Sequence, residues 1–411
     1  MRQQRGSVMV TALILTALLV AVLGSIAASQ HLAMGAYQSQ LRQRRAEAAA
    51  RAALAHAIAE LGEADTNLVT LQDDWALLGG EKGTEIYTLA DDAKYRVQIV
   101  DANSLINVNN ANQQQLEALP LTTEEVASLL DWRETGTNAR TDGAKDEYYN
   151  QLATPYNAKL KRLDTLSELL LVREWTAAML YVPQQEAVSA AELPEDTDGN
   201  VLPLASLLTV DDGAPNLRAD GTARVNVNVA PTPALWTQLG ITGPAAIQLS
   251  NGGAAATFAQ LLIRPGVTQT VAQQLLDGAS FGTETRYEGK INVNTAPEAV
   301  LKTIPNLTPD VAASLVQQQG TGLQSLGELA SVSGLTTNVL AQIADSLTVG
   351  SDTFIVRAWG ESGGEGVAIE ATIRITDGKP SIIALDQLPE VSVPGWWNWV
   401  PDEETTEATQ Q

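Results

Sequence analysis

The feature that most constrains this chain is an uninterrupted apolar run close to its start. Val8 to Ala28 holds 21 uncharged, mostly apolar residues, and Arg2 and Arg5 precede it. A helix of about 20 such residues can cross a bilayer, and the basic residues predict a cytoplasmic N-terminus with the rest translocated. The alternative is a cleaved signal peptide, because Ser25-Ile26-Ala27 resembles a small-x-small cleavage site. The apolar run is, however, longer than the roughly 7–15 residues of such signals.

The residues that follow the apolar run favour its retention as part of a longer helix. Residues 30–61 contain no proline and are rich in helix formers, with apolar residues at helical spacing (Leu54, Ile58 and Leu61). Gly62 then ends the pattern in the manner of a helix stop. We therefore expect one N-terminal helix over residues 7–62, with its transmembrane part at 7–29. Its length from residue 8 to residue 61 would be about 80 Å.

Composition argues against enzymatic chemistry and against nucleic-acid binding. The net charge of −23 opposes phosphate binding, which needs clusters of Lys and Arg. The sequence has no cysteine, and its two histidines, His31 and His56, lie in or just after the apolar segment. Gly360–Gly364 fits the G-x-S-x-G nucleophile pattern, but that chemistry requires a later histidine and none follows. We interpret this segment as a turn between strands and expect a protein that is not an enzyme.

Three stretches in the middle of the chain align with one another. Each begins with Asn-Val-Asn, continues with an alanine and a leucine at fixed distances, and is completed by a second helical half; the repeats are 106–182, 225–278 and 291–349. They resemble the helix-hairpin-helix fold, whose DNA-binding members usually have glycine-rich turns. Here Pro120 and Pro305 occupy such turns and lack the N–H that would meet a phosphate. We therefore expect a structural function for the repeats.

An acidic segment with Pro and Gly separates the first two repeats, over residues 183–224. Asp196–Asn200 and Asp211–Gly221 look like calcium loops but lack the EF-hand spacing, which places glycine sixth. We interpret the whole segment as a solvated linker. Alternating polar and apolar residues on both sides of the repeats, after Gly62 and after Val349, predict strands.

The start of the chain resembles the type IV pilins and the pseudopilins of type II secretion. A short basic leader ends in Gly6, and the apolar run and continuous helix follow. The resemblance implies that prepilin peptidase cuts after Gly6 and that Ser7 becomes the methylated N-terminus. Most members carry a glutamate at the fifth mature position, where this chain has Thr11.

The segment between the two halves of the first repeat, from Asp131 to Leu169, narrows the resemblance. Its elements G-A-x-D-x-Y-Y, P-Y and D-x-L-S-E-L, in this order, closely resemble the type II secretion minor pseudopilin K family, which also lacks the fifth-position glutamate. Lys145 departs from the family, because an acidic residue is common there. The resemblance implies bound calcium, for which Asp142, Asp146 and Glu147 are the candidates, with ordinary surface charge as the alternative.

The expected fold class is α+β. A pilin-like long N-terminal helix packs with an antiparallel sheet, and a large α-helical domain of helix-hairpin-helix-like (SAM-like) repeats is inserted between the strands. The expected parts are a leader at 1–6, the helix at 7–62, the pilin-like α/β domain at 63–105 and 350–395, the insert at 106–349 and a flexible tail at 396–411. Trp396, Trp397 and Trp399 in this tail are either a contact patch or a segment folded back onto the sheet.

The function implied by the resemblance is that of a minor pseudopilin at the tip of the type II secretion pseudopilus. It would start fibre assembly and assist protein secretion, anchored in the inner membrane with its bulk in the periplasm. The implied partners are other major and minor pseudopilins, the inner-membrane secretion platform, prepilin peptidase and secreted cargo. The alternatives are a minor pilin of a type IV pilus system and a membrane-tethered helix-hairpin-helix DNA receptor.

Overall fold

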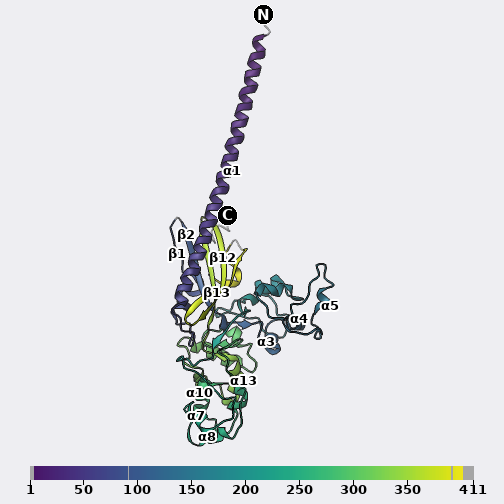
Figure 1. The fold of residues 1–411 in the computed structure, drawn as a ribbon. Helices are drawn as coiled ribbons and strands as arrows, with labels where there is room; N and C mark the ends of the chain where they lie inside the picture. Colours follow the sequence, from purple (N-terminus) through teal and green to yellow (C-terminus); the bar gives the residue numbers. More distant parts are fainter. Residues whose placement is uncertain (1–3, 91, 390–391, 401–411) are drawn as a thin grey trace.

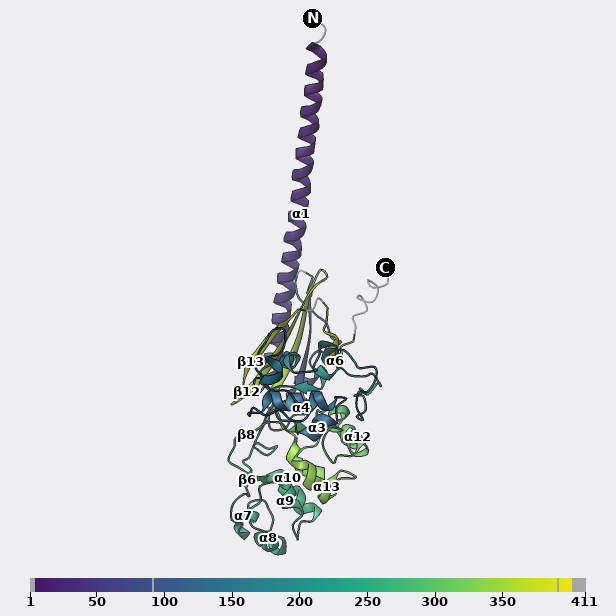
Figure 2. The same cartoon turned by 90° about the vertical axis from the view of Figure 1, so that its right-hand side faces the viewer.

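A single helix dominates the computed structural model, which describes residues 4–90, 92–389 and 392–400. This helix, α1 (Gln4–Leu61), has 58 residues and is therefore about 87 Å long. Its N-terminal part stands clear of the body and its C-terminal part lies on a sheet, below which the helical region follows (Figures 1 and 2). The predicted α+β fold class, a long helix on an antiparallel sheet with an additional helical region, is confirmed.

The sheet contains five antiparallel strands in the order β1-β2-β11-β12-β13. Their bounds are β1 (Tyr87–Thr88), β2 (Ala93–Asp101), β11 (Thr353–Ser362), β12 (Glu365–Thr376) and β13 (Lys379–Leu388). The turn between β11 and β12 consists of Gly363 and Gly364, both with positive φ, which is the backbone that a tight hairpin requires. The G-x-S-x-G segment thus ends β11 with Gly360 to Ser362 and forms the predicted turn between strands with Gly363 and Gly364.

Helix α1 packs across β2, β11 and β12 through a stripe of small side chains. The fully buried members of this stripe are Ala46, Ala49, Ala50, Ala53 and Ala57. A Cβ atom on Gly360 of β11 would lie 2.1 Å from the carbonyl oxygen of Ala46 and 2.3 Å from the nitrogen of Ala50. The helix and the strand therefore approach backbone to backbone, and only glycine fits at position 360.

The helical region leaves the sheet after β2 and returns to it at β11. Its helices are α3 (Gln113–Glu117), α4 (Thr123–Arg133), α5 (Asp146–Tyr149), α6 (Ala177–Tyr181), α7 (Pro233–Thr237), α8 (Gly243–Ser250), α9 (Phe258–Leu262), α10 (Gln269–Gly278), α11 (Glu298–Leu301), α12 (Pro309–Gln318) and α13 (Thr337–Ile343), and α2 (Asp74–Leu77) follows α1 outside the region. The Thr268 and Thr336 hydroxyls cap α10 and α13, because each accepts a hydrogen bond from a free N–H of the first turn.

Each repeat is closed by a short pair of parallel strands. The pairs are β3 (Ile106–Asn107) with β4 (Leu208–Thr209), β6 (Val225–Asn226) with β7 (Ala279–Ser280), and β9 (Ile291–Asn292) with β10 (Leu347–Thr348), while β5 (Ala214–Pro215) pairs antiparallel with β8 (Arg286–Tyr287). The first repeat therefore continues past its predicted end at 182, to β4. The predicted solvated linker at 183–224 is wrong in its middle, because Leu204, Leu207 and Leu208 are buried in the core of the helical region.

In the first and third repeats, the second asparagine of the Asn-Val-Asn segment ties the two halves of the repeat together. Asn109 donates to the carbonyl oxygen of Leu163 at 3.0 Å and accepts from its N–H at 2.7 Å. Asn294 makes the same pair of bonds with Leu323, at 2.9 and 2.8 Å. In the second repeat Asn228 is exposed and donates to the carbonyl oxygen of Phe281 at 3.2 Å. The repeated motif is therefore a structural clamp.

Part of the predicted flexible tail is packed on the sheet. Trp397 and Trp399 are buried with Trp359 in a small cluster. Their indole nitrogens donate to the side chains of Glu370 and Gln98, at 3.0 and 2.9 Å. The tryptophan segment thus folds back, which corrects the prediction of flexibility for residues 396–400. Residues 401–411 lie outside the described residues, and the other expected domain boundaries stay a prediction.

Candidate functional site

The N-terminal part of α1 is the first candidate site. Its side chains are exposed from Val8 to about Leu41, and an 18-residue window of this helix has a mean hydropathy of 2.5. Within residues 4–90, 92–389 and 392–400, it is the one helix long and apolar enough to cross a membrane. The helix runs without a break through Ser25-Ile26-Ala27, the alternative cleavage site. The chain therefore carries one long apolar N-terminal helix of the kind that anchors a single-pass protein.

Thr11 is accommodated within this apolar segment by its own helix. Its hydroxyl donates to the carbonyl oxygen of Val8 at 3.0 Å, and Thr16, Ser25 and Ser29 bond in the same way to carbonyls three residues earlier. A hydroxyl that bonds back to the helix backbone tolerates apolar surroundings. The backbone of Gly6 and Ser7 is part of α1, and cleavage between them stays a prediction.

The second candidate site is the loop after α4, in the segment that carries the resemblance to the K family. The carboxylate of Asp131 is fully buried and accepts hydrogen bonds from the backbone N–H of Arg140 at 2.9 Å and from its guanidinium at 2.7 Å. Arg140 also pairs with Glu134 at 2.5 Å. A Cβ atom on Gly143 would lie 2.0 Å from the Asp131 carboxylate, so the loop closes directly over this group.

The buried side chain of Lys145 stabilises the same loop. The residue is 5% exposed, and its ammonium group donates to the carbonyl oxygens of Asp131 and Glu134, the latter at 2.7 Å. Burial lowers the pKa of Lys145, and the nearby Asp131 carboxylate acts in the opposite direction. The position at which the family commonly has an acidic residue thus holds a buried cation.

The three calcium candidates are not brought together. Asp142 and Glu147 are exposed, and one oxygen of the half-buried Asp146 accepts the backbone N–H of Ala158 at 2.8 Å. In the part of the chain that the structure describes, no group of three or more His, Cys, Asp or Glu side chains is arranged to hold a metal ion. The predicted set of ligands therefore does not form a site there.

Two other carboxylates are buried where the repeats meet. Asp212 accepts from the Asn107 side chain at 2.7 Å and from the N–H of Gly289 at 2.9 Å, and Asp101 accepts from the Asn292 side chain at 2.8 Å. Burial raises the pKa of Asp101 and raises the pKa of Asp212 to about 7, against the opposing effect of its hydrogen bonds. Neither carboxylate was predicted from the sequence to be buried. Asp212 lies in the segment interpreted as a linker.

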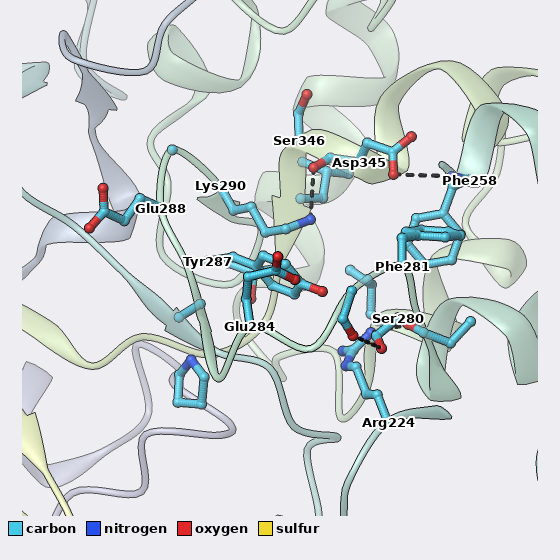
Figure 3. A pocket seen from close by; sticks show the side chains of 18 of the residues that line it. Arg224, Phe258, Ser280, Phe281, Glu284, Tyr287, Glu288, Lys290, Asp345 and Ser346 are labelled. Carbon is cyan, nitrogen blue, oxygen red and sulfur yellow. Dashed lines mark hydrogen bonds between the residues drawn. The ribbon is translucent and has the colours of Figure 1, made fainter. Parts of the chain in front are cut away.

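A cavity of about 470 Å³ lies between the second and third repeats. Figure 3 shows Lys290 and Arg224 reaching into it from different sides, with Tyr287 and Glu284 between them. The Lys290 ammonium donates to the carbonyl oxygen of Asp345 at 2.7 Å, and burial lowers its pKa to about 8. The Arg224 guanidinium donates to the carbonyl oxygen of Leu276. Each cation thus bonds to the backbone near the end of the repeat whose start it precedes.

The fold and its exposed segment define a class of protein. A membrane-length helix whose second half lies on an antiparallel sheet, with its first half apolar and exposed, is the architecture of a pilin-like subunit. Residues 91–182 match the family described as type II secretion system (T2SS), protein K, and residues 287–348 match the helix-hairpin-helix motif. The chain is thus similar, over residues 91–182, to the protein K family of the type II secretion system.

A solved structure is also similar to this chain. A chain of the GspK-GspI-GspJ complex from the enterotoxigenic Escherichia coli type 2 secretion system is similar at 15% identity, with a TM-score of 0.48. The alignment covers 88% of this chain and 99% of that chain. No curated protein matches the sequence significantly.

Proposed function

We propose that this chain is a minor pseudopilin at the tip of the pseudopilus, where it starts fibre assembly and assists protein secretion without being an enzyme itself. The match of residues 91–182 to the protein K family supports the assignment to type II secretion. The position within the fibre rests on one observation of shape. The helical repeats lie beyond the sheet at the end opposite the N-terminus (Figures 1 and 2).

This shape favours an end position for a steric reason. Subunits of a helical fibre that bundle their N-terminal helices stack along the fibre axis, so that each body is followed by another body. The repeats carrying α7, α8, α10 and α13 extend from the body in the direction away from the N-terminus. They would occupy the space of the next subunit, and a subunit with nothing beyond it has no such conflict.

Thr11 gives independent support. A glutamate at the fifth mature position lies in an apolar fibre core or bilayer, where an unpaired charge costs several kcal/mol. It is tolerated when it pairs with the N-terminal amine of an axial neighbour. A subunit at the end lacks one of its two axial neighbours, and the Thr11 hydroxyl, bonded to the carbonyl of Val8, needs no such partner.

The proposal also includes the cellular location and the partners of the chain. Arg2 and Arg5 favour a cytoplasmic N-terminus in the inner membrane, with the body in the periplasm. Prepilin peptidase, the inner-membrane platform, the other pseudopilins and secreted cargo are the proposed partners. The exposed face of α1 and the edge strand β13, with Ile382, Ile383 and Leu385 all exposed, are surfaces that neighbouring subunits can use.

The proposal is tested by locating the chain in isolated fibres. Because the sequence has no cysteine, a single cysteine at Ile247, 60% exposed on α8, can carry a gold label without competing thiols. We expect one label per fibre, always at an end. An introduced cysteine in a major pseudopilin, labelled in parallel, should decorate the whole shaft. Labels from position 247 distributed along the shaft would exclude the tip position.

The helix-hairpin-helix match over residues 287–348 is the observation that favours the alternative of a DNA receptor. The charge of −23 argues against it. A mobility-shift measurement with duplex DNA decides between the two, because salt-sensitive binding would favour the receptor and absence of binding the pseudopilin.

A further inference from the structure

The loop after α4 is held by positively charged side chains of the protein itself. Helix α4 ends at Arg133, and the last carbonyl groups of a helix lack partners within the helix. Here the Lys145 ammonium donates to the carbonyl oxygens of Asp131 and Glu134. A cation at a helix C-terminus is also favoured by the helix dipole. Lys145 thus closes the end of α4 from a position 14 residues away in the sequence.

A second cation neutralises the buried carboxylate of the same loop. Asp131 is fully buried, and its two oxygens accept the backbone N–H and the guanidinium of Arg140. The loop therefore gathers carbonyl and carboxylate oxygens around two side-chain cations. Oxygens of these kinds are what Ca²⁺ takes, in sets of six to eight. In this loop the oxygens are already bonded to Lys145 and Arg140.

The calcium that the family resemblance implies does not fit these residues. Of the three candidate ligands, Asp146 bonds to the backbone at Ala158, while Asp142 and Glu147 are exposed. In the described part of the chain they belong to no group of three or more side chains arranged to hold a metal ion. A divalent ion placed among the oxygens of Asp131 and Glu134 would face the Lys145 ammonium at short range, and like charges repel strongly in a buried site.

We propose that in this chain Lys145 and Arg140 perform the structural task of a bound divalent cation. The ammonium group holds the carbonyl oxygens at the end of α4, and the guanidinium neutralises Asp131. The loop from residue 134 to residue 145 is therefore ordered without a metal ion, and its stability is independent of calcium and insensitive to chelators.

Amide hydrogen exchange of the full-length protein in detergent tests this proposal. We expect exchange over residues 134–149 of the unsubstituted protein to be the same with calcium chloride and with excess EDTA. Lys145→Met should speed exchange in this segment about tenfold or more under both conditions, because it leaves buried carbonyl groups without their charged donor. Lys161→Met, at an exposed lysine of the same repeat, is the matched control and should leave the segment unchanged.

Two results would overturn the proposal. The first is faster exchange of residues 134–149 on addition of EDTA, reversed by calcium, in the unsubstituted protein. This comparison needs no variant and is decisive even where Lys145→Met fails to fold. The second is an exchange rate in Lys145→Met equal to that of the unsubstituted protein, since the ammonium group would then hold nothing.

Discussion

Asp212→Asn should remove a specific part of the pH dependence of stability. The folded pKa of about 7 lies about three pH units above the ordinary value of 3.8. At 1.36 kcal/mol per pH unit this corresponds to about 4 kcal/mol, as an order of magnitude. Between the two pKa values the folded state keeps a proton that the unfolded state has lost. Stability must therefore fall as the pH rises from about 4 to about 7.

The measurement is the difference in unfolding free energy between the variant and the unsubstituted protein, at pH 4.5 and at pH 7.5. Asparagine retains an oxygen that can accept the N–H of Gly289 but carries no charge. At the higher pH the variant therefore avoids the free-energy cost of a buried, ionised carboxylate. The variant should therefore gain relative stability on going from pH 4.5 to pH 7.5, by about 3 kcal/mol, because about 1 kcal/mol of the full effect is already present at pH 4.5. Asp101, whose pKa is also raised, is present in both proteins and cancels. Urea unfolding of the detergent-solubilised chain gives both numbers.

The matched control is Asp211→Asn. It removes one negative charge from the adjacent residue, which is only half-buried and pairs with Arg374 at 2.7 Å. Both variants remove one negative charge, so this control distinguishes the effect of a buried carboxylate on stability from the effect of the change in net charge. If Asp212→Asn and the unsubstituted protein show parallel stability between pH 4.5 and pH 7.5, Asp212 is not desolvated and the reasoning is refuted.

Three further predictions follow from the clamp, the tail and the leader. Asn294→Ala should cost about 2–3 kcal/mol of stability in urea unfolding, because it breaks two buried bonds, whereas Asn228→Ala, at an exposed position, should cost less than about 1 kcal/mol; equal losses would contradict the clamp. Trp397→Ala should cost about 3–5 kcal/mol by emptying a fully buried position, and a near-neutral result would mean that the segment does not pack there. Intact mass of the membrane-extracted protein should show loss of residues 1–6 and a start at Ser7, and retention of the leader in a Gly6 variant would locate the cut.

Elements with long periodic patterns could be predicted from the sequence. The apolar run and the residues after it predict α1, and alternation predicts the strands of the sheet. The packing face of α1 was only partly predicted. Leu54 and Leu61 are buried, but most of the contact with the sheet is made by alanines. Alanine is common in any helix, and its burial here depends on Gly360, which is distant in the sequence.

Features built from very short segments could not be predicted in the same way. A strand of two residues, such as β4, has no periodicity, so the end of the first repeat was missed. The Asn-Val-Asn repetition was visible, but not the carbonyls that its asparagines reach. Lys145 was visible as a departure from the family, and only the fold shows that its ammonium lies under the end of α4.

The pairing of β2 with β11 has a consequence for the order in which the molecule forms. Asp101 and Phe354 are partners across these two strands, and the whole helical region separates them along the chain. During synthesis and export, β2 emerges long before the strand that completes it. Until then one edge of β2 offers unpaired backbone groups, and such an edge readily accepts a foreign strand. The strand pairs that close the repeats lie entirely within the insert. The repeats can therefore fold during this interval, whereas β2 can pair with β11 only after the whole insert has been made.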